Sequence, residues 1–274
     1  MKKSPSPGRK KLDFPPLPGY LFSQKGVSMK KIILSALLLF TVLFVYAAEK
    51  APGRHNQNFD AFFAPGKWNK NDFYMARSPR PKMAYLGEMI QEKDHIINKT
   101  PPLSDEEIFK KHCDKVYACM MYKGSFSGRT LISSKMSFDH RMAPLIVLAA
   151  PLGKCSKGMP ELREHFEIVL YDKGINVWHH EYKDGKPSWY KIAFLETEFK
   201  PKTVYDLKID LRRYKNMTRI TVKCNEHSFG FDTTFMPKTF YTGITGCEGR
   251  CRFYDFKVRS LEKKRKAPAK RKKK

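Results

Sequence analysis

The stretch 165–182, HFEIVLYDKGINVWHHEY, constrains the fold more than any other part of this chain. Two runs rich in β-branched and aromatic residues flank the turn sequence Asp172-Lys173-Gly174, a combination typical of a β-hairpin. Successive side chains of a strand point to opposite faces, so each run offers one face to a core and leaves a second face free to meet something else. The pattern therefore predicts a hairpin near the centre of an antiparallel sheet.

Similar short runs recur at regular spacing from Val116 onward, and turn residues separate nearly all of them. Many short strands with frequent turn signals favour a sandwich or barrel over alternating strands and helices. We predict an all-β fold whose strands cover 116–122, 129–138, 145–150, 165–171, 175–182, 189–195, 204–212, 218–224, 228–233, 240–245 and 252–260.

Residues 48–115 are irregular, aromatic and interrupted by prolines, and we expect them to cover one edge of the sheet structure. Short strands at 82–86 and 95–98 are possible within this region. The sequence Ser104-Asp105-Glu106-Glu107 has the form of a capping box, which predicts one short helix running through His112.

The segment 29–47 has the order of a secretory signal peptide: Lys30-Lys31, an apolar run over 32–46, and small residues at Ala47 and Ala48. An uncleaved anchor is the alternative. A signal peptide belongs at an N-terminus, so we expect Met29 to be the start and 1–28 to be a gene-model extension or a long n-region. The prediction is an exported chain: secreted, periplasmic or at the cell surface.

Six cysteines form an even set in a chain predicted to be exported, so disulfides are the default expectation. The last two flank a glycine-containing turn and could clip it locally. A metal site there is disfavoured because no histidine lies at ligand spacing, and neither a metal nor another cofactor is expected. The cysteines are Cys113, Cys119, Cys155, Cys224, Cys247 and Cys251.

The formal net charge is +26, and the C-terminal segment 261–274, LEKKRKAPAKRKKK, holds only part of the excess. The presumed folded region is therefore basic as well. A segment of this composition cannot bury enough apolar area to fold, so we predict a disordered tail. In an exported protein such charge favours anionic polysaccharide or surface association, with no specific nucleic-acid target.

Several segments resemble the concanavalin A-like lectin/glucanase superfamily, which includes laminin-G-like jelly-rolls. The resemblance covers roughly 116–260. It implies an antiparallel jelly-roll β-sandwich and, by analogy at the level of the fold, a domain that binds or cuts carbohydrate. The segments are KGSF leading to ISSKMSF, FEIVLY, INVW, YDLKIDLRR, MTRITVKCN and YTGITGCEGRCRFYDFKV.

Trp178, His180 and Tyr182 share one face of their predicted strand, and we take them as the candidate carbohydrate-binding residues. An aromatic ring can stack on the apolar face of a sugar while polar neighbours meet its hydroxyls. The alternative is that Trp178 belongs to the core. Trp189 and Tyr190 are second candidates. His179 and His180 point to opposite faces and cannot share one metal ion from a regular strand.

A glycan-cleaving enzyme is the second hypothesis, but it needs two suitably spaced carboxylates. The nearest sequence, Glu161 to Glu167, lacks the central aspartate of similar glucanases. Glu196 and Glu198 come just before Pro201, which is expected to end their strand. These acids are expected to be solvated surface groups. No nucleophile, zinc-protease or P-loop motif is found in the sequence. A basic protein that binds nucleic acid through its tail is the third hypothesis.

Overall fold

A computed structural model describes residues 58–80, 87–112 and 116–261. The expectations for the signal segment, for a strand at 82–86 and for the tail beyond Leu261 lie outside the described residues. All of the described residues belong to one compact unit. Within them no helix is long and apolar enough to cross a lipid bilayer.

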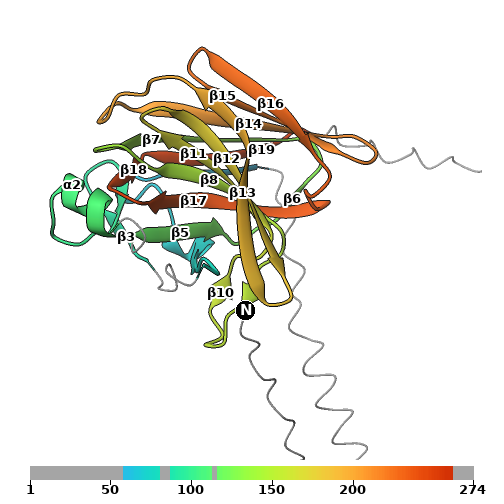
Figure 1. Ribbon diagram of the computed structural model, residues 1–274, viewed down its shortest axis with the longest axis horizontal. Coiled ribbons are helices and arrows are strands. Elements are labelled where there is room, and N and C mark those ends of the chain that lie inside the picture. Colours follow the sequence, from blue (N-terminus) through green and yellow to red (C-terminus); the bar gives the residue numbers. More distant parts are fainter. Residues whose placement is uncertain (1–57, 81–86, 113–115, 262–274) are drawn as a thin grey trace, which may run out of the picture. The chain divides into compact units, whose positions relative to one another are not determined.

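Two large antiparallel sheets form a β-sandwich, which confirms the predicted fold class (Figure 1). The eight-stranded sheet has the order β13 (Lys186–Glu196), β12 (Gly174–Lys183), β11 (His165–Tyr171), β8 (Pro144–Ala149), β17 (Thr239–Cys247), β5 (Tyr117–Tyr122) and β2 (Phe73–Ala76), and β6 (Phe126–Ser127) also pairs with β17.

The nine-stranded sheet has the order β16 (His227–Thr233), β15 (Thr218–Cys224), β14 (Tyr205–Arg213), β7 (Thr130–Phe138), β18 (Cys251–Phe253), β4 (Ile96–Asn98) and β3 (Met89–Gln91). Its remaining strands are β19 (Asp255–Ser260), which pairs with β7, and β1 (Asn58–Phe62), which pairs with β19. A small separate hairpin joins β9 (Gly153–Lys154) and β10 (Pro160–Glu161).

Every strand predicted from Val116 onward has a counterpart, although the last one divides in two at Tyr254. The Tyr254 amide donates to the Lys135 carbonyl at 2.9 Å, between the pairings of β18 and β19 with β7. The N-terminal region contributes more than an edge cover, because β1 to β4 pair into both large sheets.

The predicted capping box is present at the start of the short helix that the sequence indicated. The Glu107 amide donates to Ser104 Oγ, and the Glu107 carboxylate accepts from the Ser104 amide. This cap begins α2 (Asp105–Glu107), which continues as the wider helical turn η3 (Ile108–His112). A further single turn, η1 (Lys70–Asp72), precedes β2.

The predicted hairpin of β11 and β12 is present in the eight-stranded sheet, but its two strands are second and third from the edge strand β13 and not at the centre. Its register pairs His165 with His180 and Glu167 with Trp178. Gly174 makes the turn possible: its φ is 140°, and a Cβ there would lie 1.9 Å from the Leu195 carbonyl oxygen. A side chain cannot occupy that space without moving the β13 backbone.

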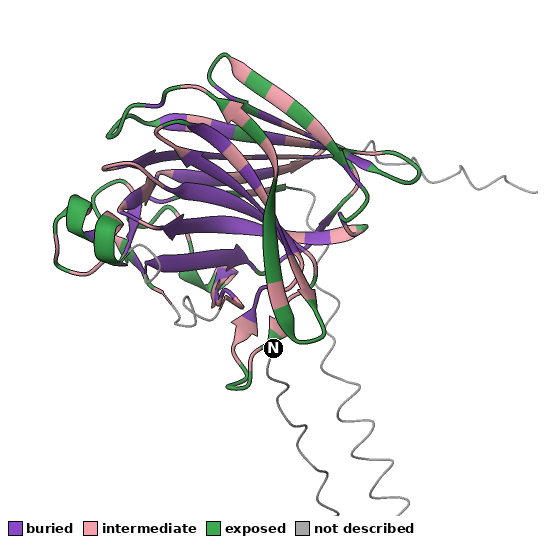
Figure 2. Ribbon diagram, viewed as in Figure 1, coloured by how far each residue is buried: buried purple, intermediate pink, exposed green. Residues whose placement is uncertain are grey.

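The main core lies between the sheets and includes Phe166, Ile168 and Leu170 from β11, together with Ile175 and Val177 from β12. Burying side chains of this size stabilises the fold by about 1.5–3 kcal/mol each. A second apolar cluster lies on the opposite face of the eight-stranded sheet. The central strands are therefore buried on both faces (Figure 2), which explains the nearly continuous apolar sequences of β5 and β8.

The five described cysteines are free, so the expected disulfides are not found among them; Cys113 lies outside the described residues. Cys224 and Cys251 belong to the core between the sheets, whereas Cys119 and Cys247 belong to the cluster on the other face. The predicted local clip is not formed, because Cys251 Sγ lies 3.7 Å from the Cys247 carbonyl oxygen and makes its contacts with backbone carbonyls.

Candidate functional site

A pocket of about 180 Å³ opens on the outer face of the eight-stranded sheet, opposite the main core. The hairpin of β11 and β12 and the neighbouring strand β13 supply most of its wall, because alternate residues of these strands face away from the core. Its lining residues are Arg80, Met142, Ala143, Glu167, Val169, Tyr171, Asn176, Trp178, His180, Trp189, Cys247 and Glu248.

Glu167 lies at the centre of a buried polar network and is only 3% exposed. Tyr117 Oη donates to its Oε1 at 3.0 Å, and His180 Nε2 lies 3.1 Å from its Oε2. An Arg80 guanidinium nitrogen lies 3.8 Å from Oε1. Burial opposes ionisation, but His180 and Arg80 hold the pKa of Glu167 well below its usual range. Glu167 is therefore a buried carboxylate anion.

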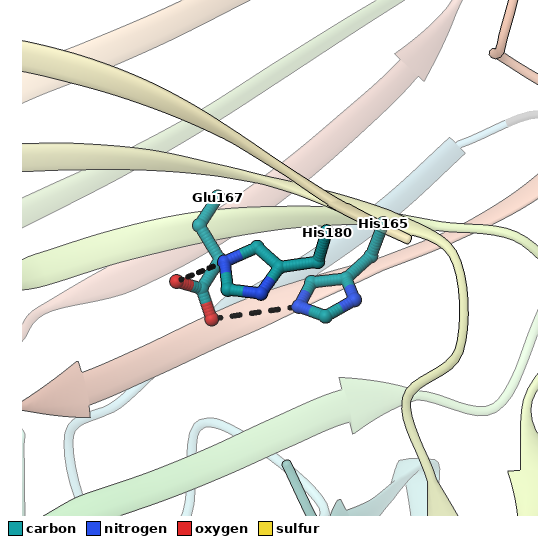
Figure 3. Close-up of side chains that lie close together, drawn as sticks. All are labelled: His165, Glu167 and His180. Atoms are coloured by element: carbon teal, nitrogen blue, oxygen red, sulfur yellow. Dashed lines mark hydrogen bonds and ion pairs between the residues drawn. The ribbon is translucent and has the colours of Figure 1, made fainter. Parts of the chain in front are cut away.

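His165, Glu167 and His180 form a compact cluster whose ligand-type atoms all lie within 4.8 Å of one another (Figure 3). His165 Nδ1 lies 2.7 Å from the Arg163 carbonyl, which can only accept, so Nδ1 carries the proton. His165 Nε2 then faces Glu167 Oε1 at 3.5 Å. Three donors of these types can in principle hold a divalent metal ion.

The ring planes of the two histidines do not fit a shared ion as they stand. The rings are stacked, with centroids 4.3 Å apart and planes 14° from parallel. A nitrogen lone pair leaves an imidazole in the plane of the ring, so nearly parallel rings direct their lone pairs side by side and not to one point. One ring would have to turn before both could bind the same ion, and the observed arrangement is a hydrogen-bonded network.

His180 is almost completely buried, and this burial lowers its pKa to about 4. Its ring is therefore neutral near pH 7, and Nε2–H can donate to the Glu167 carboxylate. Burial also acts on Arg80, but the charge of Glu167 outweighs it and raises the pKa of the guanidinium. The same guanidinium lies 5.5 Å from the Tyr117 ring centroid and 5.8 Å from that of Trp189, within cation–π distance.

Two of the three predicted site residues, Trp178 and His180, line this pocket. Trp178 also packs against the second apolar cluster, so the core interpretation and the site interpretation both hold in part. Tyr182 is not among the lining residues; its ring lies 4.0 Å from the Arg163 guanidinium instead. Of the second candidates, Trp189 lines this pocket and Tyr190 lines a different one.

The sequence prediction of solvated surface acids is wrong for Glu167 and for Glu161, which are 3% and 7% exposed. The position of the hairpin turn could have identified Glu167 as a site residue. With the turn at 172–174, His165 pairs with His180 and Glu167 pairs with Trp178, and these four side chains share one face of the sheet. The sequence contained no comparable signal for Arg80 or Glu248, which reach the pocket from distant segments.

This geometry defines a class of protein: an antiparallel β-sandwich with an aromatic and charged pocket on the outer face of one sheet. The chain matches no protein-family model and no curated protein.

Solved structures offer likenesses of fold. A protein of unknown function with a galectin-like fold from Bacillus subtilis has a TM-score of 0.49 at 10% identity, over 76% of this chain and 98% of that chain. The Lotus tetragonolobus seed lectin has a TM-score of 0.48 at 7% identity, over 73% and 96%. A glycoside hydrolase family 16 endo-glucanase from Bacteroides ovatus has a TM-score of 0.45 at 11% identity, over 73% and 99%.

These neighbours belong to the classes that the sequence resemblance names, lectins and glucanases. Each of these TM-scores is below 0.5, so the sandwich architecture rests on the strand pairing of this chain itself.

Proposed function

We propose that this protein binds carbohydrate in the pocket lined by Trp178 and Trp189. The observation that supports this most directly is the presence of two indole side chains around one pocket that also contains buried charged groups. Indole rings can stack on the C–H face of a sugar, while a few fixed polar groups select its hydroxyls. Trp189 is 45% exposed, so much of its surface is available to a ligand.

The polar groups suit a ligand rich in hydroxyls. Asn176 Oδ1 is buried without a hydrogen-bond partner in the structure, and an unpaired buried acceptor of this kind favours a donor from a ligand or from water. Arg80 can donate further hydrogen bonds, because among the described residues its guanidinium contacts one Glu167 carboxylate oxygen and Ser78 Oγ. A volume of about 180 Å³ is below the 300–1,000 Å³ that is typical of drug-sized ligands, so we infer that one sugar unit enters.

The pocket does not require an acidic sugar, because the positive charge of Arg80 is already balanced by the Glu167 anion beside it. On the nine-stranded sheet, basic side chains are largely paired across strands, as in Arg219 with Asp232 at 2.7 Å and Arg129 with Asp210 at 3.1 Å. We therefore infer two separable contributions: a pocket that recognises a sugar, and net positive charge that attracts anionic polysaccharide without specificity.

A glycan-array experiment on the full chain tests this proposal. Trp189→Ala should weaken binding about tenfold through lost stacking, and Trp178→Ala should do the same. Tyr214→Ala is the control, because Tyr214 is also an exposed aromatic residue but does not line the pocket. Binding to the pocket should survive high salt, since stacking and neutral hydrogen bonds are weakly screened.

Binding that disappears with salt, or that both tryptophan variants retain, would leave electrostatic adhesion only.

A second measurement tests the proposed export. If the segment 29–47 is a cleaved signal peptide, N-terminal sequencing of the protein made in its own cells should begin at Ala48.

A further inference from the structure

Two carboxylates, not one, line the candidate pocket. Glu167 projects from β11, and Glu248 lies in the turn between β17 and β18. The Glu248 backbone is in the left-handed region, with φ of 61°, and its amide donates to the Val116 carbonyl at 2.9 Å. Non-glycine residues adopt this conformation at a cost, and such residues are common at functional sites.

The two carboxylates have opposite surroundings. Tyr117 and His180 make hydrogen bonds to the Glu167 carboxylate, with the Arg80 cation nearby. The Glu248 carboxyl makes no hydrogen bond or ion pair with a described residue. Burial raises the pKa of Glu248, and the Glu167 charge raises it further, while Arg80 acts in the opposite direction. Glu167 is thus kept as an anion, whereas Glu248 holds its proton to a higher pH than an ordinary glutamate, and this is the direction of difference that acid-catalysed glycoside cleavage uses.

We propose that Glu248 and Glu167 together hydrolyse a glycosidic bond of the sugar held in this pocket. This inference rests on the proposed carbohydrate binding. In the first step the bond between the anomeric carbon and the leaving oxygen breaks. Its electron pair goes to that oxygen, which takes the proton of Glu248. In the second step a water oxygen bonds to the anomeric carbon, and the water proton returns to the Glu248 carboxylate.

Glu167 stabilises the positive charge that develops at the anomeric carbon, because it is an anion already fixed in a site of low dielectric. It does not take up a proton in either step. Tyr117 and His180 are positioning residues: they hold the carboxylate in place and keep it ionised. At the end of the cycle Glu248 carries a proton again, and water is the only reactant besides the glycoside.

The experiment uses the full chain with two sets of probes: 4-nitrophenyl glycosides of the common hexoses, pentoses and hexuronic acids, and the glycans that bind on the array. Released 4-nitrophenolate and new reducing ends are measured across pH. Glu248→Gln should lower the rate on unactivated glycans by about 10²-fold or more, and the loss should be smaller on 4-nitrophenyl glycosides, whose leaving group needs little protonation. The wild-type rate should fall at alkaline pH as Glu248 loses its proton, and this limb should be absent in the variant.

Glu164→Gln is the control, because Glu164 lies three residues before Glu167 but outside the pocket lining, and this variant should retain the wild-type rate. Glu248→Gln should fold normally, since the Glu248 carboxyl makes no hydrogen bond with any residue that the structure describes. Glycans that bind in the pocket without any product would overturn the hydrolysis and leave carbohydrate binding in place. Absence of both binding and product would overturn both proposals, and an unchanged rate in Glu248→Gln would refute the assignment of the acid.

Discussion

The buried histidine of the candidate site should make the protein unstable in mild acid, and the size of this effect can be worked out. The pKa of His180 falls from 6.5 to about 4 because the ring is buried. Below pH 6.5 the unfolded chain binds a proton that the folded chain rejects, so the free energy of unfolding decreases as the pH falls from 6.5 to about 4. The full difference corresponds to roughly 3 kcal/mol, of which about 2 kcal/mol should be lost by about pH 5.

The perturbation is His180→Gln, whose side-chain amide can still donate to Glu167 but cannot titrate. Urea unfolding of both proteins at about pH 7.5 and pH 5 gives the change in unfolding free energy for each. The wild-type protein should lose about 2 kcal/mol more than the variant over this interval. His179, whose pKa is also lowered by burial, is present in both proteins, so its contribution cancels.

Ser188→Ala, an exposed position on β13, is the control and should reproduce the wild-type change. If wild type and His180→Gln lose the same free energy within about 0.5 kcal/mol, then His180 is not held neutral by burial. The description of Glu167 as an anion that accepts from a neutral histidine would then be wrong.

Three further outcomes are expected. Phe256→Ala removes a fully buried ring from the main core and should lower the free energy of unfolding, measured in urea, by about 3–5 kcal/mol. Phe194→Ala, at an exposed position, should stay within about 0.5 kcal/mol of wild type. Equal losses in the two variants would contradict the assignment of the core. Among the five cysteines that the structure describes, Cys155 should alkylate first in the native protein. The Lys157 and Met159 amides and Arg77 lower its pKa despite some desolvation, while burial raises the pKa of Cys119 to about 12. Peptide mass spectrometry identifies the modified thiol, and native disulfides would refute this. Zinc should leave the melting temperature unchanged, and a rise that His165→Gln abolishes would show that the stacked rings do turn to bind an ion.

The sequence alone was sufficient for the strands from Val116 onward and for the hairpin of β11 and β12, although not for its place next to the edge strand β13. Alternation of side chains and turn residues are local signals, so the pairing of β11 with β12 and the shared face of Trp178 and His180 follow from 165–182 itself. The capping box at Ser104 is equally local, because its two hydrogen bonds lie within one turn of chain. Such features depend on neighbours a few residues away.

Only the tertiary structure decided which groups meet in the pocket. Arg80, Glu167 and Glu248 come from distant parts of the chain, and no periodicity in the sequence reports that a turn and an irregular segment will close over one sheet face. Tyr182 shares a strand face with Trp178 but packs against Arg163, whose guanidinium also donates to the Lys154 carbonyl of β9. The cysteines follow the same rule: their number suggested disulfides, but the packing of the whole sandwich puts Cys224 and Cys251 in the core between the sheets and Cys119 and Cys247 in the cluster beyond the eight-stranded sheet. The charge states in the pocket depend on three-dimensional packing and not on any one segment: His180 and Arg80 keep Glu167 ionised against the effect of burial, whereas burial itself keeps His180 neutral.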